Sequence, residues 1–329
     1  MTISIDTQVK EINPVFANAG TRSQGRDVTA RYAGCIAASK KVSWDIDKDV
    51  IQGRSFDLGH KFLPDGLSLI SEFSYLTESE KRYLSQIQGR TYANIFGLVE
   101  RFIDTKVAEL YDDQLGNSVA QEALNRFSIE EVKHQELFRR VDALAGAVMP
   151  AGYQFAAPDP DAVAGVVLGK GNWAVLGLTL HIELFTQSHY QESIASDDNL
   201  SPLFKDVFLY HWQEERQHAI LDELEWRRCN ADVTPAERDT AVDELIDLVV
   251  AVDGILQGQA VNDAKYFVET GQRVLSDGIH QSVADGLLKA YRWQYILSGA
   301  GHPHFLKVLG EFTTDAQQNR IKAALSTLM

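Results

Sequence analysis

The chain has 329 residues, 45% hydrophobic and 23% charged, an ordinary balance for a globular protein that excludes disordered and fibrous architectures. Its 46 acidic residues exceed its 31 basic ones, giving a net charge of -15 without a basic stripe, so we expect neither nucleic acid nor an anionic membrane surface as a partner. Two cysteines cannot form a disulfide framework, no uncharged apolar run reaches the roughly 18 residues of a membrane span, and no secretory signal is visible, so we expect a cytoplasmic protein.

The first part of the chain divides into an irregular segment and the start of a helical core. In residues 1–76, glycines and prolines interrupt helical periodicity, which predicts a wrapping segment of short helices and loops. The core is expected over residues 77–229. It opens with a capping box at residues 77–80, which predicts a helix ending near Tyr111. A second long helix is predicted over residues 118–147.

The rest of the chain is also predicted to be helical. A proline-containing connection of about twenty residues follows, long enough to cross a bundle at about 3.3 Å per residue. The third and fourth core helices are expected over residues 172–196 and 202–228. Residues 230–329 are predicted to pack on the core as C-terminal helices of the same domain, at about 235–270, 277–297 and 314–328. The class is therefore all-α, with four long helices and flanking ones.

Two Glu-x-x-His motifs carry the chemistry-bearing pattern. Glu131 and His134 lie on the second predicted core helix, and Glu215 and His218 lie on the fourth. Residues three apart share one face of a helix, so each motif points a carboxylate and an imidazole in the same direction. A single motif is expected by chance in a chain of this composition, and its simplest interpretation is a solvated helix face. The matched placement of the two motifs indicates more than chance.

Each motif has a carboxylate opposite it on the preceding helix. Counted from the connecting turns, Glu100 faces Glu131 and Glu183 faces Glu215, all about 22–24 Å from a turn at ~1.5 Å per residue. Glu100 and Glu183 lie among apolar residues, where an unpaired carboxylate costs several kcal/mol. Two divalent cations would balance the four charges. The pattern is that of a dinuclear, carboxylate-bridged site in a helical bundle.

Two further residues lie near this pattern. His211 precedes Glu215 by four residues and shares its helix face, whereas the other motif has Phe127 at the equivalent position. From its position alone, His211 is a third nitrogen ligand, a hydrogen-bonding neighbour of the ligands or a core histidine. Tyr92 lies two turns before Glu100 and is a candidate pocket residue, although a packed core aromatic is the simpler interpretation.

The ordered set resembles the p-aminobenzoate N-oxygenase (AurF-like) family of ferritin-like non-haem di-iron oxygenases. The motif residues that carry this resemblance are Glu100, Glu131, His134, Glu183, His211, Glu215 and His218. The resemblance implies a ferritin-like four-helix bundle in which all seven bind two Fe ions, with Mn or a mixed Fe/Mn pair also compatible with the ligand types. It further implies that the reduced pair takes O₂ to a peroxo species, which oxidises the nitrogen of an arylamine-type substrate.

The partners follow from that chemistry. No phosphate loop or dinucleotide fingerprint is present, so electrons are expected from an external donor, a reductase or a ferredoxin-like protein. The flanking segments could cover a small-molecule substrate cavity or form a homodimer interface.

Other functions remain open from the sequence. The same ligands would serve a di-iron hydroxylase or an acyl-carrier desaturase, although His211 argues against the desaturase. A ferritin-like ferroxidase or iron-binding protein would not need the flanking segments. A radical subunit like that of ribonucleotide reductase would need a tyrosine near one metal, and Asp104 and Thr105 occupy the turn after Glu100.

Overall fold

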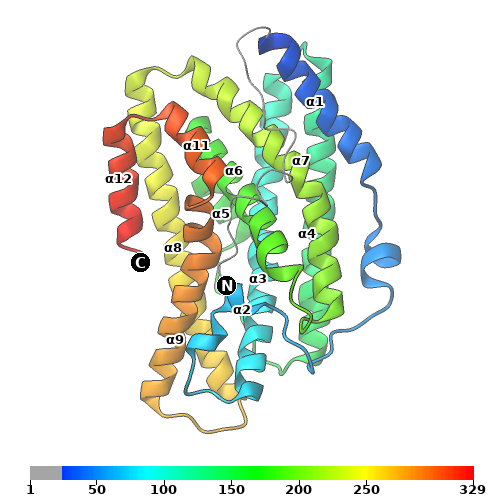
Figure 1. The fold of residues 1–329 in the computed structure, drawn as a ribbon, viewed down its shortest axis with the longest axis vertical. Coiled ribbons are helices and arrows are strands. Elements are labelled where there is room, and N and C mark those ends of the chain that lie inside the picture. The colour runs from blue at the N-terminus through cyan, green and yellow to red at the C-terminus, as the bar shows by residue number, and fades with distance from the viewer. Residues whose placement is uncertain (1–23) are drawn as a thin grey trace, which may run out of the picture.

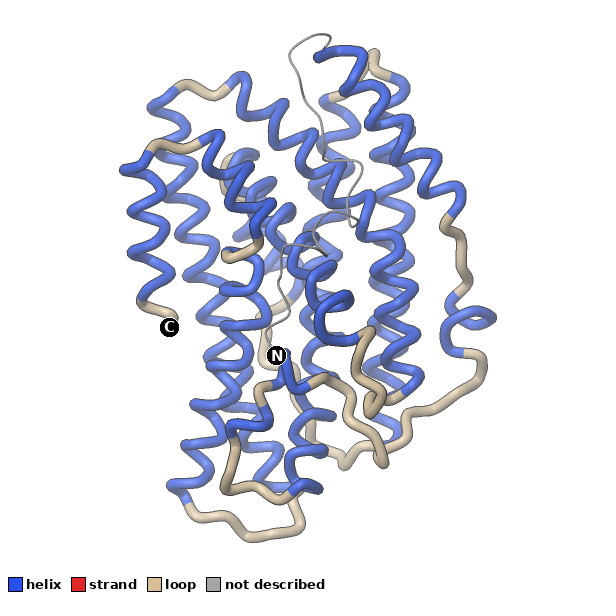
Figure 2. Tube along the Cα trace, viewed as in Figure 1, coloured by secondary structure: helices blue, strands red, loops and turns tan. Residues whose placement is uncertain are grey.

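The computed structural model describes residues 24–329, and whatever was predicted for residues 1–23 lies outside the described residues. Within the described part, every regular element is helical: twelve α-helices are joined by short loops and a few 3-10 or π-helical turns (Figure 2). The predicted all-α class is confirmed. None of the helices in this range is both long enough and apolar enough to cross a membrane.

The first two core helices form a closely packed pair. α3 (Glu78–Asp113) begins at the predicted capping box, where the Thr77 side chain accepts from the Glu80 backbone N–H and the Glu80 carboxylate accepts from that of Thr77. α4 (Ser118–Val148) begins after Asn117, whose side chain accepts a hydrogen bond from the Ala120 backbone N–H. Such caps satisfy backbone donors that a helix start leaves unpaired. α3 and α4 pack against each other along their lengths.

The second pair of core helices is joined to the first by a connection that contains its own helix. α5 (Pro160–Leu168) lies within that connection and packs on α3. α6 (Asn172–Ser188) continues into the π-helical turn η3 (His189–Ile194), where the sequence predicted one regular helix. α7 (Pro202–Asp232) begins at the predicted proline, packs against α6 and also contacts α4. The four long helices therefore pack as two linked pairs.

The described N-terminal part contains a longer helix than predicted. α1 (Gln24–Lys41) spans 18 residues and packs against α4 and α7, at the upper right of Figure 1. The expectation of only short helices here was wrong, because Gly34 sits in open space and does not break the helix. Tyr32 and Cys35 are buried on its inner side. The rest of this segment holds only single turns: η1 (Ile46–Ile51), α2 (Asp65–Ser68) and η2 (Ile70–Glu72).

The C-terminal helices cover the opposite side of the molecule, at the left of Figure 1. α8 (Pro235–Thr270) begins at a second capping box and contacts α3, α6 and α9. The remaining elements are α9 (Asp277–Arg292), the π-helical turn η4 (Trp293–Leu297), α10 (Ser298–Ala300), α11 (Pro303–Phe312) and α12 (Asp315–Ser326). These helices add a second layer over α6, and α11 lies where the sequence predicted no helix.

Candidate metal centre

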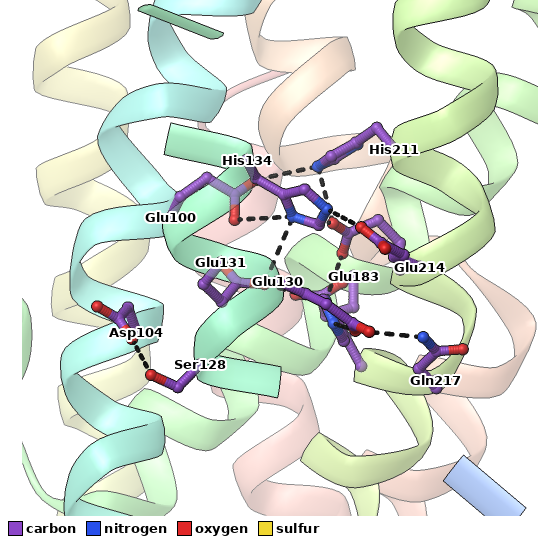
Figure 3. Close-up of polar contacts among 12 residues, drawn as sticks. Glu100, Asp104, Ser128, Glu130, Glu131, His134, Glu183, His211, Glu214 and Gln217 are labelled. Carbon is purple, nitrogen blue, oxygen red and sulfur yellow. Dashed lines mark hydrogen bonds and ion pairs between the residues drawn. The ribbon is translucent and has the colours of Figure 1, made fainter. Parts of the chain in front are cut away.

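The predicted ligand residues come together in the interior, midway along α3, α4, α6 and α7 (Figure 3). None of their side chains is more than 3% exposed. Six of them form two overlapping groups of potential metal ligands: Glu100, His134, His211 and Glu215 in one, and Glu131, His134, Glu215 and His218 in the other. Within each group the donor atoms lie within 4.8 Å of one another. These buried clusters could therefore hold metal ions.

The first group brings two imidazoles against two carboxylates. His211 Nε2 lies 3.0 Å from Glu100 Oε1 and 2.7 Å from Glu215 Oε1. His134 Nδ1 lies 3.0 Å from the same Glu215 oxygen and 3.7 Å from Glu100 Oε2. His211 therefore faces the cluster from α7 and makes this end rich in nitrogen.

The second group lies around the other oxygen of the same carboxylate. His218 Nδ1 is 3.3 Å from Glu215 Oε2 and 3.0 Å from Glu131 Oε1. Glu215 thus presents Oε1 to the first group and Oε2 to the second. A carboxylate in that position can bridge two cations, which is the arrangement that the matched sequence spacing predicted.

Glu183 and Tyr92 differ in how close they come to these groups. Glu183, on α6, belongs to neither four-residue group, but its carboxyl meets that of Glu215 and lies near Glu131. It is therefore placed beside the shared carboxylate. The Tyr92 hydroxyl is 2.7 Å from His189 Nδ1, and its ring packs on Phe96. Tyr92 is a buried core aromatic, outside both groups.

Several donor atoms of the cluster have no hydrogen-bond partner among the described residues. These atoms are both carboxylate oxygens of Glu131, Nδ1 of His134, Oε2 of Glu183 and Oε1 of Glu215. Some of these atoms lie within ion-pair distance of a neighbouring imidazole or carboxylate, but the angles are not those of a hydrogen bond. A buried polar atom left unpaired costs about 1–3 kcal/mol, more when it is charged. All these atoms are lone-pair donors that a cation would satisfy, so the residues present fit a metal centre.

The pKa shifts of the glutamates indicate an excess of negative charge in the cluster. Burial raises the pKa of Glu131 well above 4.5, and the Glu100 charge raises it further. Burial and the Glu215 charge raise the pKa of Glu183 in the same way. Burial also acts to raise the pKa of Glu215, but the charges of His211 and His218 outweigh it and lower this pKa. The four carboxylates therefore cannot all be ionised without compensating positive charge.

Two further glutamates orient the motif histidines, and they do so crosswise. His134 Nε2, from α4, lies 2.9 Å from Glu214 Oε2 on α7, and His218 Nε2, from α7, lies 2.8 Å from Glu130 Oε2 on α4. A carboxylate that accepts from Nε2–H keeps that proton in place, so Nδ1, which faces the cluster, is the nitrogen that would bind a metal. The sequence reasoning missed these residues. The signal was present, because both motifs read Glu-Glu-x-x-His.

Residues from the N-terminal part support these orienting glutamates. Ser39, on α1, donates to Glu130 at 2.6 Å. Trp44 stacks parallel to the His134 imidazole at 6.1 Å between ring centroids. Lys133 Nζ lies over the Trp44 ring at 3.8 Å and 2.5 Å from Glu214 Oε1. The packing of this segment on α4 and α7 therefore also covers the outer side of the cluster.

The comparisons with known proteins add nothing to this geometry: no family model matches the chain, and no curated protein matches it. The resemblance to the p-aminobenzoate N-oxygenase family is therefore neither supported nor contradicted by them. Any reaction assigned to the centre rests on the residues themselves.

Proposed function

We propose that the chain is a non-haem di-iron oxygenase that uses O₂ to oxidise the nitrogen of a small amine. The observation that carries this proposal is the shared carboxylate of Glu215, whose two oxygens face two different sets of buried ligands. A single structural ion would need only one set. The unpaired lone-pair atoms around it and the two oriented imidazoles support the same conclusion.

The ligand types favour a redox-active transition metal. Imidazole combined with carboxylate suits iron and manganese, whereas a site made of oxygen ligands alone would suit magnesium or calcium. His134 and His211 meet at one end, and His218 stands alone at the other. The two ions would therefore differ in coordination, which favours binding a small molecule such as O₂ at one of them. Iron is proposed from the resemblance, with manganese or a mixed pair as alternatives.

The reaction has a simple balance. One oxygen atom of O₂ enters an N–H bond of the amine to give a hydroxylamine, and the other leaves as water after taking up two electrons and two protons. Two irons held by this ligand set would supply the reducing electrons, and an external donor would restore them. The surrounding residues keep the ligands in place and exclude water, since all seven are almost fully buried.

The test is product analysis with the metal-loaded protein. Protein reconstituted with Fe(II) is given a chemical reductant, ¹⁸O₂ and a panel of aniline-type amines. We expect hydroxylamine, nitroso or nitro products carrying ¹⁸O, detected by mass spectrometry. Glu215→Ala should abolish them, whereas Glu136→Ala, at a partly exposed position on α4, should not.

Other outcomes would redirect the assignment. Turnover of acyl-carrier or hydrocarbon substrates without any amine product would contradict N-oxygenation and favour a desaturase or hydroxylase. Rapid iron oxidation with formation of a large mineral-filled shell would instead indicate a ferroxidase. If the reconstituted protein binds no transition metal at all, the proposal is wrong in every version.

A further inference from the structure

The two glutamates that orient the motif histidines differ in the charge of their other partners. Glu214, which accepts from His134 Nε2, also lies 2.5 Å from the ammonium of Lys133, the residue directly before His134 on α4. The same ammonium lies over the Trp44 ring at 3.8 Å, so it is held between the indole and the carboxylate. The Glu214 side chain is only 1% exposed, so water screens this ion pair weakly. The charge of Glu214 is therefore balanced close to the imidazole that it orients.

Glu130, the corresponding glutamate on α4, has neutral partners instead. The Gln217 amide donates to its Oε2 at 3.2 Å (Figure 3), and a serine hydroxyl of α1 donates to its Oε1 at 2.6 Å. In residues 24–329, no lysine or arginine lies within ion-pair distance of Glu130. Gln217 directly precedes His218 on α7, which is the place that Lys133 has in the other motif. The same motif position thus carries a neutral amide in one half and an ammonium in the other.

The charge of the accepting glutamate affects how strongly each imidazole can bind a cation. A carboxylate that accepts from one ring N–H raises the basicity of the opposite ring nitrogen. A cation paired with that carboxylate reduces the effect, because it cancels much of the negative potential at the ring. Nδ1 of His134 should therefore be the weaker metal ligand and Nδ1 of His218 the stronger one.

We propose that Lys133 and Gln217 make the two halves of the metal centre electronically unequal, Lys133 by weakening the His134 ligand and Gln217 by leaving the charge behind His218 uncompensated. The inference rests on the proposed function, because it requires two bound ions. Neither residue would touch a metal or a substrate, so both are positioning residues. The ion beside His218 would favour its oxidised state more than the ion beside His134.

A purely structural ion pair predicts a different result. If Lys133 only held α4 against α7, Lys133→Gln would loosen the centre and lower its metal affinity. The proposal predicts the opposite sign. A glutamine at this position can donate to Glu214 as Gln217 donates to Glu130, but it brings no positive charge.

The test exchanges the two partners in the full-length protein. The overall constant for binding two Fe(II) ions is measured without oxygen by competition with a chelator. We expect Lys133→Gln to raise this constant about three- to tenfold and Gln217→Lys to lower it by a similar factor, less than the roughly 10–100-fold effect of losing an orienting partner altogether. The double exchange should return the constant close to the native value. Lys133→Arg keeps the charge and should leave the constant unchanged.

Mössbauer spectra of the protein loaded with ⁵⁷Fe(II) report on the two ions separately. Ferrous ions in different ligand sets give different quadrupole doublets. We expect Lys133→Gln to shift one doublet and Gln217→Lys to shift the other. A shift of the same doublet in both variants, or of neither doublet, would overturn the proposal, as would a fall in the Fe(II) binding constant of Lys133→Gln.

Arg140→Gln is the matched control for general charge. Arg140 lies seven residues after Lys133 on α4, two turns along a similar face, and pairs with Asp47 and Glu136. Its replacement removes a cation without altering either orienting glutamate, so the Fe(II) binding constant and both doublets should be unchanged. An equal rise of the constant in Arg140→Gln would show that any lost cation has this effect and would contradict the proposal.

The outcomes also separate this inference from the proposed function. A native chain that binds no iron contradicts the proposed function and this inference together. Two bound ions with the expected changes, but no oxidised amine, would contradict the proposed reaction and support the inference. Two bound ions whose affinity and spectra do not respond to the exchange would contradict the inference alone.

Discussion

Two buried polar clusters each include one residue of α3, Thr91 in one and Glu100 in the other. These two residues lie about 14 Å apart along the helix at ~1.5 Å per residue, and the clusters differ in how their hydrogen bonds are satisfied. Around Asp263, Thr91 Oγ1 donates at 2.7 Å, Gln259 Nε2 donates at 2.8 Å and the Tyr291 hydroxyl also donates. In the described residues, no polar side-chain atom of these four lacks a partner. At the candidate metal centre, both carboxylate oxygens of Glu131 lack a hydrogen-bond partner.

The difference distinguishes a polar cluster whose hydrogen bonds are complete from one whose unpaired atoms could bind a ligand. Both clusters are fully buried and both contain carboxylates, so burial and charge alone would not tell them apart. Hydrogen-bond satisfaction does, because a complete network stabilises a core and an incomplete one costs free energy until something binds.

The largest expected effect comes from removing the shared carboxylate. Glu215→Ala takes a ligand from both groups at once, so we expect the purified variant to retain neither ion, as measured by elemental analysis after gel filtration. Asp263→Asn, at the satisfied cluster, should keep full metal content. Two ions retained by Glu215→Ala would erase the proposed distinction.

In the metal-free protein, replacing a carboxylate by an apolar residue should change the free energy of unfolding in opposite directions at the two clusters. Glu183→Met removes a buried carboxyl with an unpaired oxygen and should raise the free energy of unfolding by about 1–3 kcal/mol. Asp263→Leu leaves three buried donors without an acceptor and should lower the free energy of unfolding by about 3 kcal/mol or more. Urea unfolding after chelation measures both, and changes of the same sign would contradict the comparison.

A smaller effect is expected from the glutamates that orient the histidines. Glu130→Ala removes the acceptor at His218 Nε2 and should weaken metal affinity about 10–100-fold without abolishing it. Competition with a chelator gives the affinity. Glu136→Ala, at a partly exposed position on the same helix, should have no effect on metal affinity. An equal loss of affinity there would mean that general charge, and not orientation of the histidine, is responsible.

The smallest effect is a pH dependence of stability at the satisfied cluster. Burial raises the pKa of Asp263 to about 7, against 3.8 when exposed. Between these values the folded chain holds a proton that the unfolded chain has lost, so stability from this group is complete below pH ~4 and falls by about 1 kcal/mol per unit as pH rises towards ~7. Asp263→Asn should remove that slope in the metal-loaded protein, as measured by unfolding at pH 5 and 7. An unchanged slope would place the titration elsewhere.

Much of the fold could be read from local rules in the sequence. The helix starts after Thr77 and Thr234 depend on capping boxes only four residues long, and both boxes formed. The π-helical turns η3 and η4 could not be predicted in this way, because their hydrogen bonding depends on packing against distant helices. The length of α1 was missed because its packing against α4 and α7 cannot be read from a local sequence pattern.

The candidate site shows the same limit. Periodicity and spacing predicted that seven residues would meet. In the structure six of them form two groups and Glu183 lies beside them, although their binding of metal remains a prediction. Glu130 and Glu214 were overlooked even though a glutamate doublet precedes both motif histidines. The apolar cavity of about 250 Å³ between α3, α5, α6 and α8 could not be anticipated, since its walls come from helices far apart in sequence that no short pattern links.

The crosswise orientation of the two histidines has a consequence for how the chain is divided. The hairpin α3–α4 supplies the acceptor for the histidine of α6–α7, and α6–α7 supplies the acceptor for the histidine of α3–α4. The same reciprocal exchange of contacts occurs between the two subunits of an isologous two-fold dimer. The pseudo-symmetry even includes the rings one turn earlier, since Phe127 stacks on His218 and His211 meets His134. Neither hairpin can therefore orient its own histidine by such a hydrogen bond, and the candidate centre is complete only once the two hairpins have packed together.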